Sequence, residues 1–174
     1  LVCLVGSEMC IRDSNIIILS DRKTSKKHAP IPILLVCSYV HHSLIKRKKR
    51  SKFGIVIESA EPREPHHFSM LFGFGASAIN PYMVNEIIEY HHKLGFLNEQ
   101  KLDKSIDNFN KAIAKGILKV MNKIGISTLH SYRGAQIFEA LGLRQKFVNK
   151  YFNNTPSRIE GAGLYVLEKE VSSR

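Results

Sequence analysis

The sequence predicts an α/β fold in which a partial parallel β-α-β-α-β-α layer is followed by a mainly helical segment. Three short apolar runs alternate with helix-like segments over residues 15–95. The runs are apolar at nearly every position, which is typical of strands buried on both faces of a parallel sheet. Beyond residue 95 the apolar positions recur at helical spacing instead. Three such units are too few to close an eight-stranded barrel, so either the sheet is open or its other strands lie in sequence outside this chain.

The first strand and helix are predicted over residues 15–46. The run "NIIILS" (15–20) is short and β-branched, and the polar stretch "DRKTSKKHAP" follows it, which predicts a buried strand and then a loop. Pro30 and Pro32 suit the first turn of a helix. Apolar residues then repeat at helical spacing until the basic run 46–52 closes the helix, namely Ile33, Val36, Val40 and Leu44.

Two further strand and helix units follow in the same order. The run "FGIVIES" (53–59) predicts a second buried strand and "PREPHHFSMLFGFG" (62–75) a short helix. "ASAIN" (76–80) predicts a brief third strand, and "PYMVNEIIEYHHKLG" (81–95) a third helix. Strands that alternate with helices in this way form a parallel sheet through right-handed crossovers. We therefore expect an α/β unit over residues 15–100.

The remainder, residues 101–174, is expected to be a helical segment. One long helix is predicted over 103–124, because a stripe of apolar residues faces away from regularly spaced lysines and Gly125 then ends it. Shorter helices are expected over 132–140, 144–152 and 163–169.

Residues 1–14, "LVCLVGSEMCIRDS", stand apart from this pattern. They have no starting methionine, no basic n-region, and an apolar core too short for a signal peptide. They resemble a translated sequencing-adapter stretch, so we expect this segment to be non-native and the chain to be truncated. No apolar run reaches the roughly 18 to 20 residues needed to cross a bilayer, and we expect no membrane partner.

The net charge of +11 and the pI near 9.7 raise the question of an acidic partner such as nucleic acid. Six of the 26 basic residues lie in the single run "KRKKRSK" (46–52), and the others are scattered along amphipathic segments. A charge run at a helix end is usually a solvated face. We therefore expect no nucleic-acid role, and keep RNA binding through residues 46–52 as the alternative.

Cysteines and histidines give no metal-site pattern. Cys3, Cys10 and Cys37 form no CxxC and are odd in number, so neither a zinc site nor a disulfide framework is expected, and the compartment is expected to be reducing. Cys37 is expected to be a buried free thiol on the apolar face of its helix. Three adjacent pairs, His41–His42, His66–His67 and His91–His92, cannot present both rings of a pair to one ion. We expect one histidine of each pair to pack and the other to be solvated.

Polar residues gather where the three predicted strands end, which is where parallel α/β folds bind ligands. They are Ser20, Asp21 and Arg22, then Glu58, Ser59, Glu61 and Arg63, then Asn80. They could orient a polar ligand or relay a proton, which would suit a stand-alone half-barrel with a ligand at Ser20, Asp21, Glu58 and Asn80. They could equally satisfy loop backbone and one another, and we favour this structural role. No Walker loop, nucleophile elbow or activated nucleophile is present, so no catalytic, cofactor-binding or metal residue is predicted.

Several long motifs occur in an order that resembles the large subunit of glutamate synthase. They are "ILSDR", "HAPIP", "VIESAEPREPHHF", "GFGASAINPY", "KGILKVMNKIGISTLHSYRGAQIFEALGL" and "SRIEGAGL". The resemblance runs from about Ile16 to about Glu170 and is closest to the last part of the central domain, with the helical lead-in toward the FMN-binding domain. The basic run 46–52 and Pro156 depart from the family pattern, and residues 1–14 match nothing in it.

The resemblance implies a degenerate TIM-barrel-like domain in an oxidoreductase that converts glutamine and 2-oxoglutarate to two glutamates. FMN, an iron-sulfur cluster and NAD(P)H or ferredoxin serve that reaction in the family. None of the cofactors is expected in this fragment, which should be inactive alone. The implied partners are the glutaminase and FMN-binding domains of the same polypeptide, and a small reductase subunit or ferredoxin. The implied location is the cytoplasm, or the plastid stroma in a plant or alga.

For this piece the resemblance implies an interdomain scaffold that helps wall the internal ammonia route. The stretch "GISTLHSYRGAQIFEALGL" (125–143) is then specified by the junction between domains. Its candidate polar contacts to the FMN-binding domain are Ser127, Tyr132, Arg133 and Gln136. We also expect the isolated chain to expose apolar surface on unfinished sheet edges and to aggregate.

Overall fold

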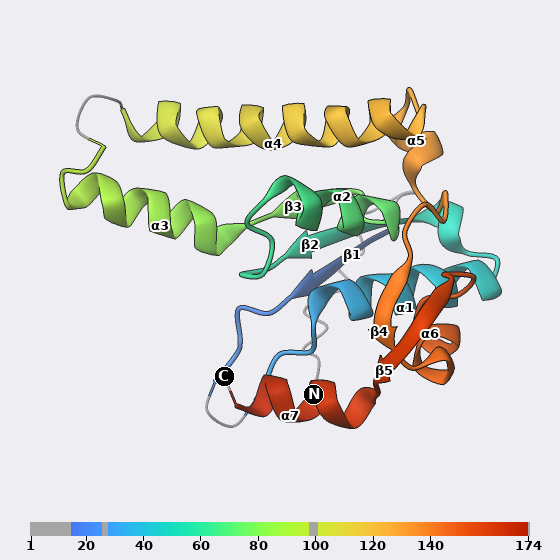
Figure 1. The fold of residues 1–174 in the computed structure, drawn as a ribbon. Coiled ribbons are helices and arrows are strands. Elements are labelled where there is room, and N and C mark those ends of the chain that lie inside the picture. Colours follow the sequence, from blue (N-terminus) through green and yellow to red (C-terminus); the bar gives the residue numbers. More distant parts are fainter. Residues whose placement is uncertain (1–14, 26–27, 98–100, 174) are drawn as a thin grey trace.

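The computed structural model describes residues 15–25, 28–97 and 101–173. A three-stranded parallel sheet lies at its centre, in the order β1-β2-β3 (Figure 1). The strands are β1 (Asn15–Ser20), β2 (Phe53–Glu58) and β3 (Ala78–Asn80). The register pairs Ile17 with Ile55 and Ser20 with Glu58, so the strands end at the same edge. The predicted α/β class and parallel layer are confirmed, whereas the foreign origin expected for residues 1–14 concerns residues outside the described part.

Helices α1 (Ile33–Lys46) and α2 (Pro65–Gly73) share one core with the sheet. This core contains strand residues Leu19, Ile55 and Ile57, helix residues Ile33, Cys37, Leu44 and Leu71, and Ala76 after α2. Both helices pack on the same sheet face, as right-handed crossovers between neighbouring strands require. Pro32 stands just before α1 as its N-cap, one position earlier than the predicted first turn.

The opposite face of the sheet corrects the expectation that the strands are buried on both faces. Ile16 and Ile18 point away from the core and are exposed, whereas Leu19 beside them is buried. Residues at alternate positions of a strand face opposite sides, so helices cover one face of the sheet and no described helix covers the other. In the described part of the chain β1 and β3 each pair only with β2, which leaves an incomplete layer.

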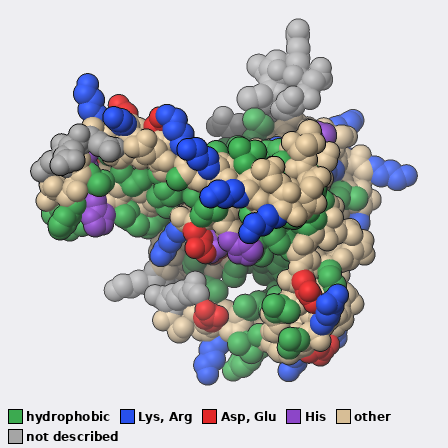
Figure 2. Space-filling view, turned by 45° about the horizontal axis from the view of Figure 1, so that its top comes forward, with side chains coloured by type: hydrophobic (Ala, Val, Ile, Leu, Met, Phe, Trp, Pro, Cys, Tyr) green, Lys and Arg blue, Asp and Glu red, His purple; other side chains and the backbone are tan. Residues whose placement is uncertain are grey.

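Two helices form an arm on one side of the sheet. Helix α3 (Tyr82–Lys93) leads away from β3, and α4 (Leu102–Ile124) returns beside it to pack on α2 (Figure 1). Close approach to α2 is possible at Gly116, where a Cβ would lie 2.5 Å from the Pro65 ring. Gly125 ends α4 at φ 78°, as predicted. Lysines follow the outer side of α4 (Figure 2), as its apolar stripe requires.

The end of the chain differs from the predicted run of helices. Helix α5 covers only Leu129–Tyr132, and β4 (Ala140–Leu143) then pairs in parallel with β5 (Ser157–Ala162). The helix predicted over 132–140 is wrong because Gly134 and Gln136 adopt left-handed backbone conformations, with φ 73° and 55°, and these interrupt a right-handed helix. The predicted helices near 144–152 and 163–169 are confirmed as α6 (Gln145–Tyr151) and α7 (Leu164–Ser172).

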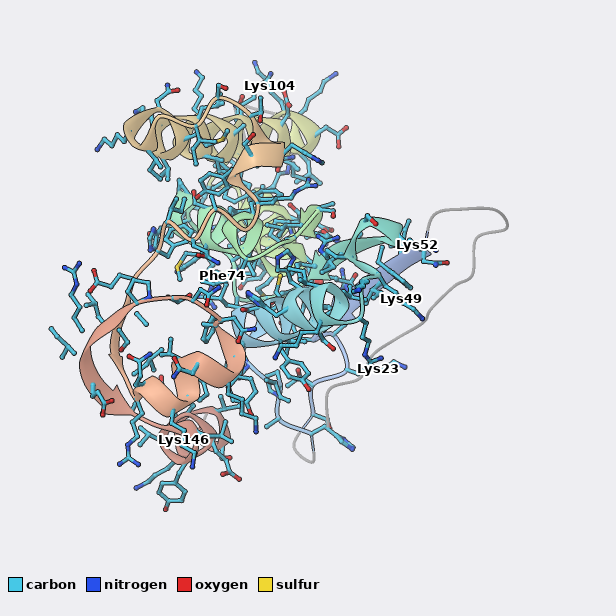
Figure 3. All side chains as sticks on the ribbon, turned by 90° about the vertical axis from the view of Figure 1, so that its right-hand side faces the viewer. Lys23, Lys49, Lys52, Phe74, Lys104 and Lys146 are labelled. Carbon is cyan, nitrogen blue, oxygen red and sulfur yellow. The ribbon has the colours of Figure 1, made fainter. Side chains whose placement is uncertain are left out.

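The C-terminal part, from β4 to α7, packs through α1 against the layer that contains β1, β2 and β3. Leu35 of α1 packs with Phe147, Val148 and Phe152 in a second core. The Ser38 hydroxyl also donates a hydrogen bond to the Tyr151 carbonyl at 2.6 Å. Helix α1 therefore contributes side chains to two cores, one on each of its sides. Figure 3 shows Phe74 in the interior between them, whereas the labelled lysines point outward.

Candidate functional site

Five residues at the ends of β1 and β2 form a connected group, which we call the strand-end cluster: Ser20, Asp21, Arg22, Glu58 and Ser59. The Ser20 hydroxyl donates to Glu58 Oε2 at 2.6 Å, and Arg22 Nε donates to Glu58 Oε1 at 2.7 Å. Arg22 also reaches Glu86 at 3.3 Å and lies over the Tyr82 ring, 4.0 Å from its centroid. The hydrogen bonds from Ser20 and Arg22 hold the pKa of Glu58 below its usual value. Glu58 is therefore ionised and fully engaged at neutral pH.

Asp21 is the centre of the other half of the cluster. Its carboxylate accepts the Ser59 hydroxyl at 2.6 Å and the Ala60 backbone N–H at 3.0 Å. Burial, and then a hydrogen bond to Asp21, raise the pKa of Tyr82 to about 12. Asn80 contributes its backbone carbonyl, which accepts the Ser59 N–H at 3.1 Å, while its side chain is exposed.

The hydrogen bonding of the cluster favours the structural role over a ligand site. The structure brings Ser20, Asp21, Arg22, Glu58 and Ser59 together, and each of them bonds to another member or to loop backbone. Beside the cluster, a Glu61 carboxylate oxygen accepts the first backbone N–H of α1 at 3.1 Å. A carboxylate occupied by several donors is a poor general base at neutral pH. A stand-alone half-barrel with its own ligand would need a carboxylate free to act as an acid or base. In the strand-end cluster the carboxylates of Asp21 and Glu58 are both occupied by hydrogen bonds.

We expect Asp21→Asn to destabilise the chain by about 2 kcal/mol, because an amide has one acceptor oxygen where the carboxylate serves three donors. The free energy of unfolding in urea measures this. Asp107→Asn is the matched control: its exposed pair with Lys111 at 2.6 Å should contribute less than about 0.5 kcal/mol. Equal losses in the two variants would show that the Asp21 bonds do not order the strand ends.

The residues predicted in stretch 125–143 lie in three different settings. Tyr132 is fully buried, and its hydroxyl donates to the Ser69 carbonyl at 3.1 Å. Burial also raises the pKa of this hydroxyl. Because Tyr132 is buried and bonded within the chain, it stabilises the interior of this chain. Ser127 is exposed on the loop after α4. Arg133 and Gln136 line a cavity beside α1.

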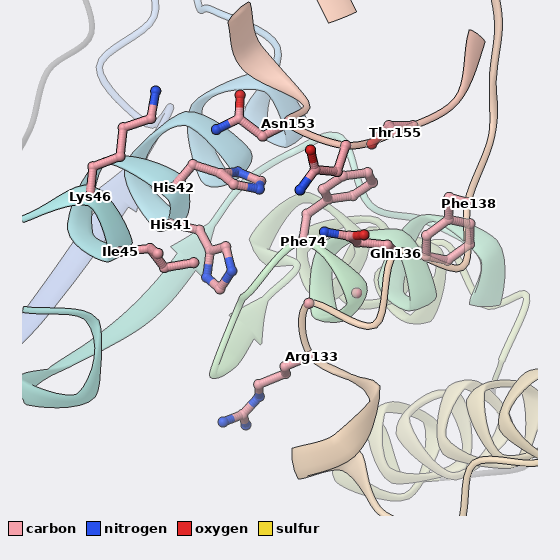
Figure 4. A pocket seen from close by; sticks show the side chains of 13 residues that line it. His41, His42, Ile45, Lys46, Phe74, Arg133, Gln136, Phe138, Asn153 and Thr155 are labelled. Atoms are coloured by element: carbon pink, nitrogen blue, oxygen red, sulfur yellow. The ribbon is translucent and has the colours of Figure 1, made fainter. Parts of the chain in front are cut away.

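This cavity, which we call the cationic pocket, has a volume of about 410 Å³. Its walls come from α1, from the end of α2, from residues 133–138, and from residues 153–155 after α6. Figure 4 shows His41, His42 and Ile45 on one side and Phe74, Gln136 and Phe138 on another, while Arg133 lies at the edge of the group on the loop that carries it. Lys46 and Arg133 are the charged residues of the lining, and none of its described residues carries a carboxylate.

Arg50 supports the pocket from behind, and the sequence did not reveal this. Its Nε donates to His41 Nδ1 at 2.9 Å and its Nη2 donates to the Gly75 carbonyl at 2.7 Å. Burial, and then the neighbouring charge of Arg133, lower the pKa of Arg50. The basic run 46–52 was predicted to be a solvated face, and Arg50 is the exception. The residue types of the run 46–52 do not distinguish Arg50 from its basic neighbours.

The histidine pairs follow the expectation only in part. His41 is buried and His42 is half-buried, but His66 and His67 are both exposed. The second pair stands near the start of the short helix α2, where neither position faces the core. Burial, followed by the charge of Arg50, lowers the pKa of His41 to about 4, so its ring is neutral at pH 7.

The described residues contain no group of three or more His, Cys, Asp or Glu side chains that could hold a metal ion. Cys37 is buried, as predicted, and burial raises its pKa to about 12. Cys3 and Cys10 lie outside the described residues. Among the helices that the structure describes, none has the length and apolar character to cross a membrane.

Comparison with known proteins gives one consistent family. Residues 2–144 match the family model for the glutamate synthase central domain. The glutamate synthase [NADPH] large chain of Bacillus subtilis is 41% identical over 160 residues, which are 92% of this chain and 10% of that protein. The glutamate synthase [NADH] of Saccharomyces cerevisiae is 39% identical over 176 residues, 97% of this chain and 8% of that protein.

A third relative is the ferredoxin-dependent glutamate synthase of Pyropia yezoensis, 37% identical over 180 residues, 97% of this chain and 12% of that protein. The chain thus spans about a tenth of the length of the curated relatives it matches. The family match begins at residue 2, so it does not set residues 1–14 apart, and their foreign origin stays a prediction.

Proposed function

The chain belongs to the glutamate synthase central domain family, and from this premise we propose that it is a structural, interdomain segment of a glutamate synthase polypeptide. The parent enzyme converts glutamine, 2-oxoglutarate and a reductant to two molecules of L-glutamate. The names of the relatives include NADPH, NADH and ferredoxin as reductants, and we propose one of these three for the parent. The parent works in the cytoplasm, or in the plastid stroma of a plant or alga.

The reactive groups of the parent belong to other parts of the polypeptide. An iron-sulfur cluster is held by several cysteine thiolates, and the described residues do not fit one: Cys37, the one cysteine among them, is buried with its Sγ 3.6 Å from the Phe74 carbonyl. The strand-end cluster is bonded within itself and leaves no group aimed at a flavin. We therefore assign FMN and the cluster to flanking domains, and no chemical step to this segment.

The main support for a scaffold role is apolar surface that this chain leaves uncovered. On the C-terminal sheet the side chain of Leu141 is 67% exposed and that of Ile159 is 62% exposed. Helix α7 adds Tyr165, at 75%, and the arm adds Phe96, at 73%. Large exposed apolar side chains gathered on several faces are typical of surfaces that another domain covers.

The open face of the central sheet suits a wall of the ammonia route. Ile16 and Ile18 form an apolar surface there, and an apolar lining excludes the water in which ammonia would be protonated and lost. The glutaminase and FMN-binding domains of the same polypeptide are the partners in this proposal. Ser127, Arg133 and Gln136 are its interdomain polar contacts, and Tyr132 supports them from inside.

Glutamate formation distinguishes a segment from a complete enzyme. Sequencing the source locus on both sides should extend the reading frame into an amidotransferase region upstream and cluster cysteines downstream. The longer product should form glutamate from glutamine and 2-oxoglutarate with one of the three reductants, and the 174-residue chain should not. Turnover by the 174-residue chain, or a locus that encodes it alone, would contradict the proposal.

We expect the double substitution Leu141→Lys with Ile159→Lys to raise the soluble yield of the isolated chain, because it places charge on an uncovered apolar face. In the longer polypeptide the same change should reduce the folded yield, because two lysines would then be buried between domains. Sedimentation of both forms measures this. Asn110→Lys with Asn122→Lys adds the same charge at exposed polar positions of α4 and should spare the longer polypeptide. Equal behaviour of the two double variants would count against a covered face.

A second candidate is an independent basic module that binds RNA, favoured by five exposed basic residues in the run 46–52. The sixth, Arg50, is engaged inside the chain, and this weakens the patch. Binding that depends on phosphate contacts falls steeply between about 50 and 200 mM salt. We expect no measurable RNA binding at the lower salt concentration.

A further inference from the structure

We propose that the cationic pocket is an oxyanion-binding site, with Arg133 as its principal ligand and a carboxylate or phosphate group as its occupant. This goes beyond the scaffold role and does not depend on it. The pocket volume of about 410 Å³ lies within the range of small-ligand sites. Among the described residues, its lining contains Lys46 and Arg133 but no Asp or Glu, so no described residue of the lining balances their charge.

Arg133 is the residue whose surroundings most favour an anion. Its Nε is buried and has no hydrogen-bond partner within the described part of the chain. An unpaired buried donor costs about 1–3 kcal/mol, and more when it carries charge. The guanidinium is also close enough to Arg50 to lower the pKa of that residue. Two neighbouring arginines beside a pocket whose described lining residues include no carboxylate are stabilised when an oxyanion binds next to them.

His41 adds a neutral donor to the same pocket. Its Nδ1 accepts the N–H of Arg50 at 2.9 Å, so the neutral ring carries its proton on Nε2. That atom faces Gly134, where it would lie 3.6 Å from an added Cβ. The hydrogen bond from Arg50 thus fixes the tautomer that presents an N–H, and not a lone pair, toward the pocket.

The backbone around the pocket is held in unusual conformations. Gln136 and Asn154 both line it, and both are left-handed, with φ 55° and 59°. The described residues contain only one other non-glycine residue with positive φ, Lys48. Left-handed backbone costs free energy at non-glycine positions and gathers at binding sites. Both side chains carry amide groups that can donate to an oxyanion.

The test measures modification of Arg133 by phenylglyoxal, with each arginine quantified by peptide mass spectrometry. Inorganic phosphate or malonate at ten times its Kd should slow the reaction at Arg133 by about ten-fold, because the modified fraction follows the unoccupied site. NaCl at equal ionic strength should not. Arg158, which is 81% exposed on β5, is the internal control and should react at one rate throughout.

Two variants keep the result specific to the pocket. Lys46→Gln should weaken the protection of Arg133, and Arg133→Gln should abolish any rise in melting temperature that phosphate or malonate gives. Arg158→Gln should retain that rise. The proposal is overturned if neither anion protects Arg133 beyond NaCl in either the 174-residue chain or a longer polypeptide that contains it, and Arg133 reacts as fast as Arg158 in both.

The longer polypeptide distinguishes the two sources of the oxyanion. Protection of Arg133 that still requires added phosphate or malonate identifies a free anion. Protection without any added anion identifies a carboxylate from the adjoining sequence, which reaches the pocket when the domains assemble. Both outcomes support the site. If glutamate formation fails in the longer polypeptide while Arg133 remains protected, the proposed function is wrong and the pocket assignment stands.

Discussion

Replacing Gly75 with alanine is expected to destabilise the chain by about 3 kcal/mol or more. Gly75 lies just after α2 with φ 107°, a conformation that L side chains rarely adopt. An added Cβ would overlap His41 Nδ1 and lie 2.6 Å from its Cγ. The ring cannot move aside easily, because it is buried and accepts the Arg50 N–H. The Gly75 carbonyl is held by the same arginine at 2.7 Å.

Gly125→Ala is the matched control, because Gly125 also has positive φ, at 78°, but nothing lies within 4 Å of an added Cβ. It should cost only the backbone strain, about 1 kcal/mol. Unfolding midpoints in urea for both variants measure the difference. If the two losses were equal, the close packing of Gly75 on the His41 ring would have no energetic weight.

The second large effect is a loss of stability on acidification, through His41. The folded-state pKa is about 4 against a usual value of 6.5, so the folded ring stays neutral over the range where the unfolded chain takes up a proton. The unfolded state then binds more protons, and stability falls as the pH falls from 6.5 toward 4. A full proton difference gives about 1.4 kcal/mol per pH unit, and the whole shift about 3 kcal/mol.

The titratable and charged groups around His41 define the pH range in which this effect should be measured. Arg50 and His42 face the ring and oppose its protonation, and Arg133 lies beyond Arg50. Glu58 and Glu89 also have lowered pKa values, so their contributions are lost only below their usual value of 4.5. The contribution of His41 should therefore be measured between about pH 5 and 6.5.

His41→Gln should flatten the dependence of unfolding free energy on pH in this range, whereas His130→Gln, at an exposed position on α5, should leave it unchanged. Urea denaturation at half-unit pH intervals provides the data. An unchanged slope in His41→Gln would show that the ring is protonated in the folded chain.

The sequence predicted the elements that strong local patterns specify. The strands at residues 15–20 and 53–58 are short apolar runs between polar segments, and the helix at 102–124 has a long apolar periodicity that Gly125 ends. The parallel register also follows, because strands joined by crossover helices end at the same edge. This is why the strand-end cluster of Ser20, Asp21 and Glu58 could be named before its geometry was known.

The parts that could not be predicted depend on contacts between distant segments. Strand β5, "SRIEGA", is polar at half of its positions and becomes a strand only because β4 lies beside it. Gln136 takes a left-handed conformation that its residue type does not favour. The inward turn of Arg50 requires His41 and the Gly75 carbonyl, which are 9 and 25 residues away in sequence. The cationic pocket therefore could not be assembled from local patterns.

Amide hydrogen exchange over residues 140–162 tests most directly whether flanking polypeptide covers this chain. Peptides from this region should exchange about ten-fold more slowly, or slower still, in the longer polypeptide than in the 174-residue chain, because its exposed strands gain a covering domain. Peptides from α1, which is already packed between two cores, should exchange alike in both. Equal exchange over 140–162 in an active longer polypeptide would contradict the interdomain role.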